Sequence, residues 1–185
     1  MNLIETPIPG LLIIEPRIFA DNRGYFFEAY NEKKFIDAGM TNKFIQDNES
    51  CSEYGVIRGL HYQLAPFAQT KLVRVILGTV YDVAVDLRAG SPTFGKWFGV
   101  ELSGDNKRQL FIPQGFAHGF SVLSEKAIFS YKCDNFYSPE NERGIAYNDP
   151  FFGIDWKIDS SDAKISEKDL INLPFSKAEM NFKNL

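Results

Sequence analysis

The sequence predicts an all-β protein, a double-sheet sandwich or barrel with a few short helices. Its apolar segments are short and are separated by Gly and Pro, and aromatic residues make up 15% of the 185 residues, with 17 Phe. Short strands bounded by turn residues are typical of β-sandwiches and β-barrels. The hydrophobic share of 44% is enough for one sizeable core, so we expect a single domain over residues 1–185.

The N-terminal region combines two strands with one helix. Leu11–Ile14 is an apolar run, and Gly24–Tyr30 is a second one that follows a turn at Asp21–Gly24. Asn31 is a typical N-cap and Gly39 a typical stop signal. We therefore expect the one early helix over residues 32–38.

From residue 44 to residue 133 nearly every segment has the pattern of a strand. We expect strands over 44–48, 56–63, 71–77, 79–87, 97–102, 109–112, 119–123 and 127–133. Alternation is clearest in 79–87, where one face carries Tyr81, Val83, Val85 and Leu87. Asp82 and Asp86 share the other face, either as catalytic acids or as acids on the sheet exterior neutralised by Arg74 and Arg88.

Two later segments also carry candidate side chains. The strand over 127–133 places Phe129, Tyr131 and Cys133 on one face, where Tyr131 is either a core phenol or part of a pocket. Residues 166–174 predict a short helix with Ser166 as N-cap. Asp169 then falls at the third helical position, where a capping-box carboxylate is common.

Composition excludes several function classes. The net charge of −4 argues against nucleic-acid binding. No apolar run approaches the roughly 20 residues of a membrane helix, and the first residues lack the pattern of a signal peptide, so we expect a cytoplasmic protein without membrane contact. Cys51 and Cys133 are too few and too far apart for a disulfide framework or a zinc knuckle, which predicts buried free thiols.

The most informative stretch is Val56–Gln63, which places His61, one of two histidines in the chain, near Arg58. Histidine takes and gives protons near neutral pH, and a neighbouring cation suits an anionic substrate. A lone histidine in a β-rich core is also often structural. On a regular strand Arg58 and His61 would face opposite ways, so a shared pocket requires a bulge, for which Gly59 is the candidate.

The second histidine lies in a segment of similar character, Ile112–Phe120. Pro113, Gly115 and His118 in this segment match the second motif of metal cupins, which predicts a cupin-type jelly roll. Metal cupins also supply a His-x-His pair and a Glu from their first motif, whereas residues 61–63 here read His-Tyr-Gln and residues 64–71 contain no acid. Two histidines without a nearby carboxylate make a poor site for a first-row metal. The sequence therefore predicts acid–base chemistry with no metal and no cofactor.

Motifs along almost the whole chain resemble one family, the dTDP-4-dehydrorhamnose 3,5-epimerases. The similar segments, in order, are 23–28 (RGYFFE), 46–48 (QDN), 58–63 (RGLHYQ), 71–75 (KLVRV), 82–86 (DVAVD), 91–95 (SPTFG), 113–120 (PQGFAHGF), 131–133 (YKC) and 147–150 (YNDP). Several motifs in the right order are far more specific than any one of them. Departures are small: Lys157 stands after Trp156 where a Pro is usual, and residues 141–143 align only through Glu142.

The resemblance implies a metal-free homodimer that acts on a nucleotide-linked 4-keto sugar. It implies that His61 is the base, oriented by Asp169, that Lys71 lies near the keto oxygen, and that Tyr131 is the acid. Tyr137 would stack on the thymine. The other implied substrate contacts are Arg23, Phe26, Glu28, Gln46, Asn48, Arg58, His118, Glu142 and Lys168. An N-terminal arm of about 30 residues would cross to the dimer partner, since exposed apolar strand edges favour pairing with another chain.

The implied reaction is epimerisation at C3 and C5 of dTDP-4-dehydro-6-deoxy-D-glucose to dTDP-4-dehydro-L-rhamnose. Three alternatives remain open from the sequence. The first is a relative that inverts one carbon, or a ketoisomerase, with the same acid–base residues. The second is a metal-dependent cupin enzyme, which Tyr62 and Gln63 disfavour. The third is a non-catalytic sugar-binding cupin, in which His61 and Tyr131 would not both be expected.

Overall fold

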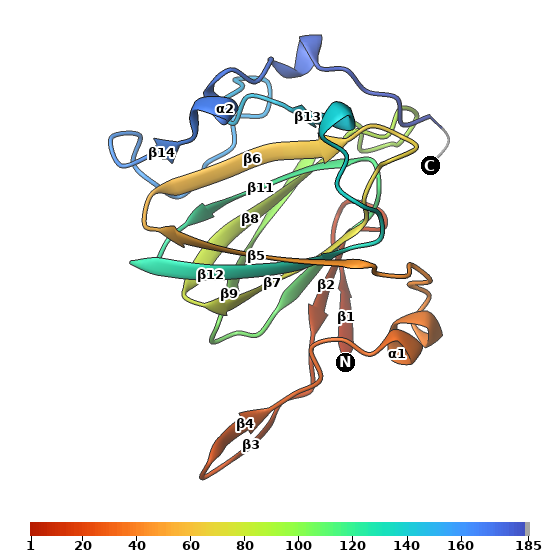
Figure 1. Ribbon diagram of the computed structural model, residues 1–185, viewed down its shortest axis with the longest axis vertical. Helices are drawn as coiled ribbons and strands as arrows, with labels where there is room; N and C mark the ends of the chain where they lie inside the picture. The colour runs from red at the N-terminus through yellow and green to blue at the C-terminus, as the bar shows by residue number, and fades with distance from the viewer. Residues whose placement is uncertain (184–185) are drawn as a thin grey trace.

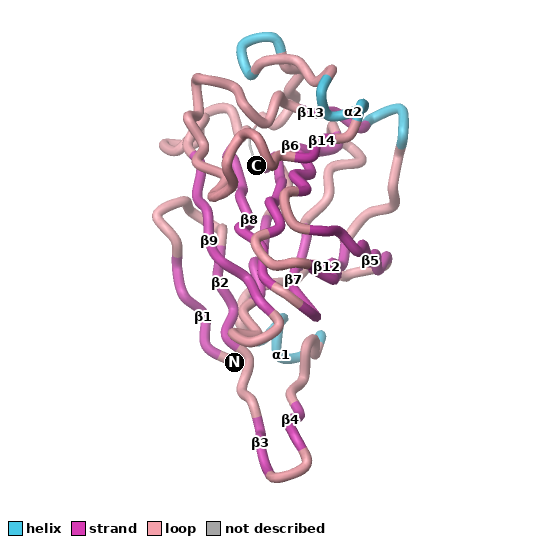
Figure 2. Tube along the Cα trace, turned by 90° about the vertical axis from the view of Figure 1, so that its left-hand side faces the viewer, coloured by secondary structure: helices cyan, strands magenta, loops and turns pink. Residues whose placement is uncertain are grey.

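The structure, a computed structural model, describes residues 1–183 and consists of two facing β-sheets with a projecting hairpin (Figures 1 and 2). The first sheet contains, in spatial order, β1 (Asn2–Glu5), β2 (Leu12–Glu15), β10 (Gln109–Ile112), β7 (Lys71–Leu77), β12 (Lys126–Cys133) and β5 (Gln46–Glu53). The second contains β13 (Glu142–Gly144), β6 (Val56–Gln63), β11 (Phe116–Val122), β8 (Thr79–Asp86) and β9 (Trp97–Ser103). This arrangement confirms the all-β, cupin-type jelly roll.

The remaining elements lie outside the two main strand orders. β14 (Lys164–Ile165) pairs with β6 in parallel, and β3 (Phe19–Asp21) and β4 (Gly24–Phe26) form the separate hairpin. The helices are short, namely α1 (Glu32–Asp37), α2 (Glu167–Leu170) and the 3-10 turns Pro139–Asn141 and Phe175–Lys177. Both predicted helices are confirmed, with Asn31 and Ser166 as N-caps that accept hydrogen bonds from the amides of Lys34 and Asp169.

Most predicted strands are confirmed to within one residue, and three are not. β5 runs over Gln46–Glu53 rather than 44–48, because its sequence is polar on both faces and shows no apolar alternation. It lies at the edge of the first sheet. β11 begins at Phe116 rather than at residue 119, and β4 ends at Phe26 rather than at residue 30. All three residues of β4 are exposed, so no buried face determines its length.

The main apolar core lies between the two sheets. It contains side chains from both sheets, such as Val73 and Leu110 of the first and Val80 and Val122 of the second, each no more than 3% exposed. The rings of Phe120 (β11) and Phe129 (β12) stack with centroids 4.2 Å apart. Burial of this apolar surface holds the sheets face to face.

Two further clusters cover the outer faces. Helix α1 packs Phe35 on the outside of the first sheet, against Ile14, Leu72 and Phe111. On the outside of the second sheet, Val83 and Val85 are covered by residues of the C-terminal region, including Phe152, Trp156, Phe175 and Phe182. In Figure 1 this region, drawn in blue, lies over β6 and carries α2. The C-terminal region, which carries Asp169, is thereby held against the outer face of the second sheet.

Asp82 and Asp86 lie on the inner face of β8, and both are fully buried. The expectation of a position on the sheet exterior is wrong, because the alternate face of β8 is covered by the C-terminal region. Arg74 does not neutralise Asp82, which pairs instead with His118; the Arg74 guanidinium lies 5.9 Å from the ring of Phe27.

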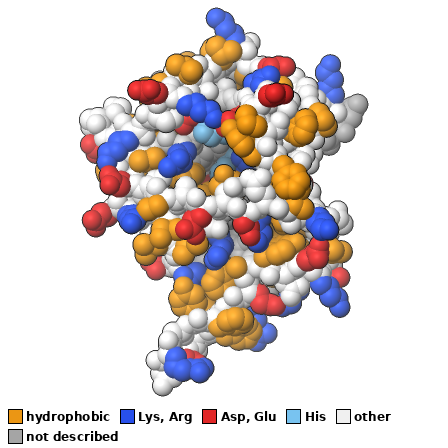
Figure 3. Space-filling view, viewed as in Figure 1, with side chains coloured by type: hydrophobic (Ala, Val, Ile, Leu, Met, Phe, Trp, Pro, Cys, Tyr) orange, Lys and Arg blue, Asp and Glu red, His pale blue; other side chains and the backbone are white. Residues whose placement is uncertain are grey.

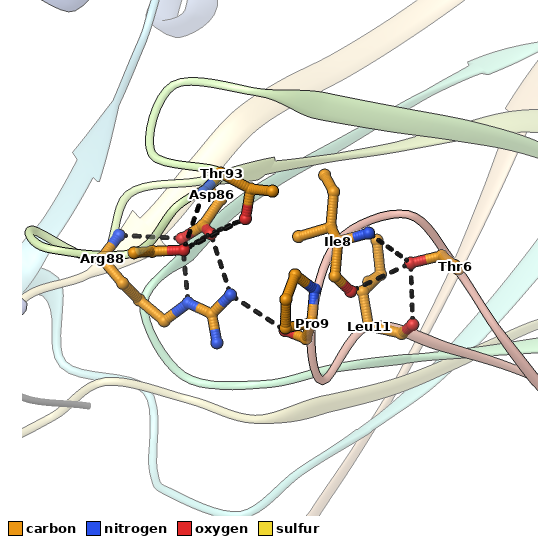
Figure 4. A network of polar contacts seen from close by, with 8 residues as sticks. Thr6, Ile8, Pro9, Leu11, Asp86, Arg88 and Thr93 are labelled. Atoms are coloured by element: carbon orange, nitrogen blue, oxygen red, sulfur yellow. Dashed lines mark hydrogen bonds and ion pairs between the residues drawn. The ribbon is translucent and has the colours of Figure 1, made fainter.

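Asp86 has a structural role. Its carboxylate accepts hydrogen bonds from Arg88 Nε (2.9 Å) and Nη2 (2.8 Å) and from the hydroxyls of Ser91 and Thr93 (Figure 4). Arg88 Nη2 also donates to the carbonyl of Pro9 at 2.9 Å. Burial alone would raise the pKa of Asp86, but these hydrogen bonds outweigh it and hold the pKa below its ordinary value. The pair thus anchors the turn between β1 and β2 to the end of β8.

Candidate active site

The candidate site is a cavity of about 150 Å³ between the two sheets. Its lining residues are Glu49, Ser50, Arg58, His61, Lys71, His118, Gly119, Phe120, Phe129 and Tyr131. Histidine side chains, coloured pale blue, are visible in a hollow with Lys and Arg side chains near it (Figure 3). The cavity therefore brings together five of the titratable residues that the sequence singled out, namely Arg58, His61, Lys71, His118 and Tyr131.

A register shift in β6 brings Arg58 and His61 to the same cavity. On the neighbouring strand β11, His118 lies opposite His61 and Phe120 lies opposite Arg58. Three steps along β6 thus match two steps along β11, as in a bulge with one extra residue. The predicted bulge at Gly59 is confirmed.

Glycine is required on both strands at the bulge. Gly59 has φ +121°, and a Cβ atom built on it would lie 2.5 Å from the Cα of Gly119. A Cβ atom on Gly119 would in turn lie 2.6 Å from the carbonyl oxygen of Arg58. Since real Cβ atoms do not approach backbone so closely, any side chain here would push β6 and β11 apart and displace His61.

Asp169 fixes the orientation of His61. Its Oδ1 lies 2.5 Å from His61 Nε2, and its Oδ2 accepts a hydrogen bond from the Gly59 amide at 3.4 Å. Asp169 is 3% exposed. Burial alone would raise its pKa, but the hydrogen bonds from His61 and Gly59 outweigh burial, so the pKa of Asp169 is lowered. Of the predicted capping box, the hydrogen bond from the Asp169 amide to Ser166 Oγ forms at 3.1 Å, while the carboxylate binds His61 and the Gly59 amide.

Tyr131 and Lys71 come from the opposite sheet. Tyr131 on β12 is half-buried, and burial raises the pKa of its phenol. Lys71 on β7 lies with Nζ 5.9 Å from the centre of the Tyr131 ring, and burial lowers the pKa of its ammonium group. The cavity is thus bounded by His61 and its carboxylate on one wall and by a phenol and a cation on the other.

His118 is held by a second carboxylate. Its Nε2 lies 3.0 and 2.9 Å from the two carboxylate oxygens of Asp82, and its ring stacks on Phe129 with centroids 6.0 Å apart. Asp82 occupies Nε2, which leaves Nδ1 as the nitrogen for a ligand. The sequence did not identify Asp82 as the partner of His118, although its alternation with Val83 on β8 was the available signal.

A polar cluster of Tyr137, Glu142 and Lys168 forms beside the cavity. The hydroxyl of Tyr137 donates to Glu142 Oε2 at 2.6 Å, and Lys168 Nζ lies 2.5 Å from the same oxygen. Burial would raise the pKa of Glu142, but these partners lower it below its ordinary value. Tyr137 is 53% exposed, so its ring is accessible to a ligand.

Gln46 and Asn48 lie on β5 beside Tyr131. Asn48 is paired with Tyr131 across the two strands, and Gln46 Nε2 donates to Asn48 Oδ1 at 3.0 Å. Gln46 Oε1 accepts from the amide of Tyr137 at 3.0 Å. These two predicted residues therefore connect the cavity to the Tyr137 segment.

Arg23, Phe26 and Glu28 are not brought to the cavity within this chain. They belong to the hairpin segment that projects from the body of the molecule in both ribbon views (Figures 1 and 2). Arg23 pairs with Asp21 at 2.6 Å, and Glu28 pairs with Lys34 and accepts a hydrogen bond from Asn31 at 3.0 Å. Phe26 is 66% exposed.

The two cysteines differ in environment. Cys133 is a buried free thiol, as predicted, and burial raises its pKa to about 11. Cys51 is also free but exposed, so the prediction of burial is wrong for it. The reason is its position on the outer face of the edge strand β5, which no other element covers among the described residues.

Two kinds of feature are absent from residues 1–183. No group of three or more His, Cys, Asp or Glu side chains is arranged to hold a metal ion there. No helix in this range is long and apolar enough to cross a membrane.

The chain is similar to one family of known proteins along nearly its whole length. Residues 5–177 match the family model described as dTDP-4-dehydrorhamnose 3,5-epimerase. The Shigella flexneri protein of that name is 54% identical over 180 residues, which are 97% of this chain and 98% of that protein.

Two crystal structures are similar along nearly their whole length. The dTDP-4-dehydrorhamnose 3,5-epimerase of Elizabethkingia anophelis is 55% identical, with a TM-score of 0.92 over 95% of this chain and 97% of that one. The Legionella pneumophila dTDP-6-deoxy-D-glucose-3,5-epimerase, in complex with dTDP-4-keto-L-rhamnose, is 51% identical, with a TM-score of 0.92 over 95% of this chain and 93% of that one. Since the family model, the relatives and the fold agree, the chain belongs to the dTDP-4-dehydrorhamnose 3,5-epimerase family.

Proposed function

We propose that this isomerase inverts C3 and C5 of dTDP-4-dehydro-6-deoxy-D-glucose and forms dTDP-4-dehydro-L-rhamnose. The observation that carries the proposal is the placement of the His61–Asp169 pair and Tyr131 on opposite walls of one cavity. Inversion at a carbon requires removal of a proton from one face and delivery of a proton to the other. A base and an acid on facing sheets meet that requirement.

The hydrogen bond to Asp169 selects the nitrogen that acts as base. Because the carboxylate accepts from Nε2–H, the proton of neutral His61 resides on Nε2 and the lone pair on Nδ1. Nδ1 then removes the proton from the carbon beside the ketone, and the electron pair moves into the C4 carbonyl as an enolate. Tyr131 delivers its phenolic proton to the opposite face, the enolate returns to the ketone, and solvent restores both protonation states.

Lys71 would stabilise the enolate oxygen. An ammonium group in a partly desolvated cavity provides the electrostatic stabilisation that is often the largest contribution in such reactions. Arg58 suits the diphosphate oxygens, because a guanidinium donates hydrogen bonds to anions. His118 would donate to them from Nδ1 as an imidazolium, since its Nε2–H is used by Asp82. We assign the nucleotide end to Tyr137, with Gln46, Asn48, Glu142 and Lys168 around it.

The test is proton NMR of the substrate with the protein in deuterated water. Deuterium at both C3 and C5 is expected, and the His61→Asn variant should lose exchange at both carbons, because His118 is held by Asp82. Deuterium at one carbon only would assign a single-centre epimerase, and binding without exchange would assign a non-catalytic cupin. Exchange by His61→Asn near the wild-type rate would contradict the role of His61.

The proposal includes chemistry without a metal ion. Residues 61–63 read His-Tyr-Gln and residues 64–71 contain no acid, so the His-x-His pair and the Glu that metal cupins supply from their first motif are missing. Exhaustive chelation should therefore leave the rate unchanged. Loss of turnover on removal of a stoichiometric metal ion would overturn this part.

We further propose a homodimer in which each arm completes the partner's site. Support comes from the arm itself, where Phe19, Tyr25 and Phe26 are at least half exposed and Arg23 lies on the hairpin. An arm of exposed aromatic side chains is stabilised by packing on another chain. The expected location of this enzyme, the cytoplasm, stays a prediction.

Mixing two inactive variants tests the shared site. If Arg23 acts in the partner's cavity, an Arg23→Ala chain mixed with a Lys71→Ala chain should regain activity, because one cavity of the heterodimer then holds both native residues. Proven heterodimers without restored turnover would contradict the proposal.

A further inference from the structure

The segment Asn135–Ser138, which carries Tyr137, is held mainly by side-chain amides. Gln69 Nε2 donates to the carbonyl of Asn135 at 2.9 Å, and Gln46 Oε1 accepts from the amide of Tyr137 at 3.0 Å. The amide of Phe136 donates to the side chain of Asn135 at 2.9 Å. The conformation of this segment therefore depends on one amide side chain of its own, Asn135, and on half-buried amide side chains from outside it.

Gln63 makes the contacts on both sides of Tyr137. Its Nε2 donates to the carbonyl of Phe136 at 3.2 Å, and its Oε1 accepts from the amide of Ser138 at 2.8 Å. Nε2 also donates to the carbonyl of Phe67 at 2.6 Å. Both donors and the acceptor of this amide are thus used, and the residue is only 5% exposed.

The backbone of Gln63 also connects to the same cluster. In the pairing of β13 with β6, Gln63 lies opposite Glu142, whose carboxylate accepts the hydroxyl hydrogen bond of Tyr137. Gln63 thus fixes the backbone on both sides of Tyr137 through its side chain. Its own backbone pairs with β13, the strand that carries Glu142. It lies on β6, two residues after His61, and is absent from the lining of the catalytic cavity.

We propose that Gln63 is a positioning residue for nucleotide binding, acting through Tyr137 and not through the reacting carbons. The inference rests on the proposed function, in which Tyr137 stacks on the nucleobase. Stacking is more favourable when the ring is already held in place, because ordering a free segment on binding costs conformational entropy. Gln63 pre-orders the ring in the free protein.

The informative variant is Gln63→Met, which keeps the length and bulk of the side chain and removes all three hydrogen bonds. Loss of the pre-ordered ring should weaken dTDP binding roughly tenfold, within the range of one base–aromatic stacking interaction. The KM should rise in parallel. The kcat should stay within about twofold, because His61, Tyr131 and Lys71 keep their positions.

A double-mutant cycle separates positioning through Tyr137 from general loosening. Calorimetric titration with dTDP would be performed on the wild type, Gln63→Met, Tyr137→Ala and the double variant. If Gln63 acts through Tyr137, Gln63→Met should change the dissociation constant by less than about twofold in the Tyr137→Ala background. Equal weakening in both backgrounds, or no weakening in either, would overturn the inference.

A control and a second variant complete the test. Asn181 makes two hydrogen bonds at 2.9 Å to the backbone of Ala65 and none to residues 136–138. Ala65 lies in the same loop as Phe67, whose carbonyl accepts a hydrogen bond from Gln63. Asn181→Leu should therefore leave dTDP affinity unchanged, and a loss equal to that of Gln63→Met would contradict specific positioning. If Gln63→Met does not fold, Gln63→Asn, which retains the amide but is one methylene shorter, takes its place with the same expected pattern.

The outcome for the wild type distinguishes this inference from the function on which it rests. A wild-type chain that binds no dTDP contradicts the proposed function and the inference together. A wild type that binds dTDP and turns over substrate, while the Gln63 variants bind equally well, contradicts the role of Gln63 alone.

Discussion

Replacement of Asp169 by Asn isolates the contribution of one charge to the proposed reaction. The variant keeps the shape of the side chain and an oxygen that accepts from His61 Nε2, which lies 2.5 Å from Oδ1. What it removes is the negative charge that faces the imidazolium formed when His61 takes the substrate proton. The expected effect is therefore on the transition state and not on substrate binding.

The magnitude follows from the geometry of the pair. With charge centres about 4 Å apart and an effective dielectric constant of about 20, the attraction is about 4 kcal/mol. The neutral hydrogen bond that Asn retains is worth about 1 kcal/mol. The net loss of about 3 kcal/mol corresponds to a decrease in kcat of about a hundredfold.

The measurements are kcat, KM and the rate of deuterium incorporation at C3 and C5. Asp82→Asn is the matched control, since it makes the same chemical change at the pair that holds His118. The control should raise KM more than it lowers kcat, because His118 is assigned to the diphosphate. If Asp169→Asn kept kcat within about threefold of the wild type, or if both variants changed KM and kcat alike, the electrostatic role of Asp169 would be refuted.

Three further predictions concern the other wall of the cavity and the fold. Tyr131→Phe should let deuterium exchange persist while net epimerisation falls, because the base remains and the acid is lost; equal loss of both by NMR would remove Tyr131 from the acid role. Lys71→Met should abolish most turnover yet raise the thermal unfolding midpoint at neutral pH. Burial lowers the Lys71 pKa, so keeping the ammonium group charged in the folded state opposes stability. A lower unfolding midpoint by calorimetry would contradict this prediction. Asp86→Asn should leave Arg88 buried without its charge partner and cost about 3–5 kcal/mol of unfolding free energy, measured by urea denaturation. Since the Asp86 pKa is lowered on folding, its stabilisation is present above the unfolded pKa near 3.8 and is lost as the pH falls below it, so the wild-type and variant curves should converge in acid.

The local sequence pattern was sufficient to predict the strands and helices whose two faces differ in polarity. The strand over residues 79–87 was predictable because Val83 and Val85 alternate with acids, and the helix after Asn31 because an N-cap and a stop signal delimit it. Strand β5 was misplaced, because an edge strand that faces a polar cavity has no apolar face to produce the alternation. The candidate residues His61 and Tyr131 could be selected from residue type and motif, since proton transfer requires side chains of that chemistry.

The sequence by itself determined an all-β chain, the supply of acid–base side chains and the family resemblance. Apart from the His61–Asp169 pair, which the family resemblance implied, only the tertiary structure decided which residues become partners. Asp169 lies 108 positions from His61 and Asp82 lies 36 from His118, and no local periodicity relates such distant positions. The inward direction of Asp82 on β8 depended on the C-terminal region covering the opposite face of the sheet. The position of Tyr137 depended likewise on amides supplied by β5 and β6, because a segment without strand partners takes its conformation from the side chains that satisfy its backbone.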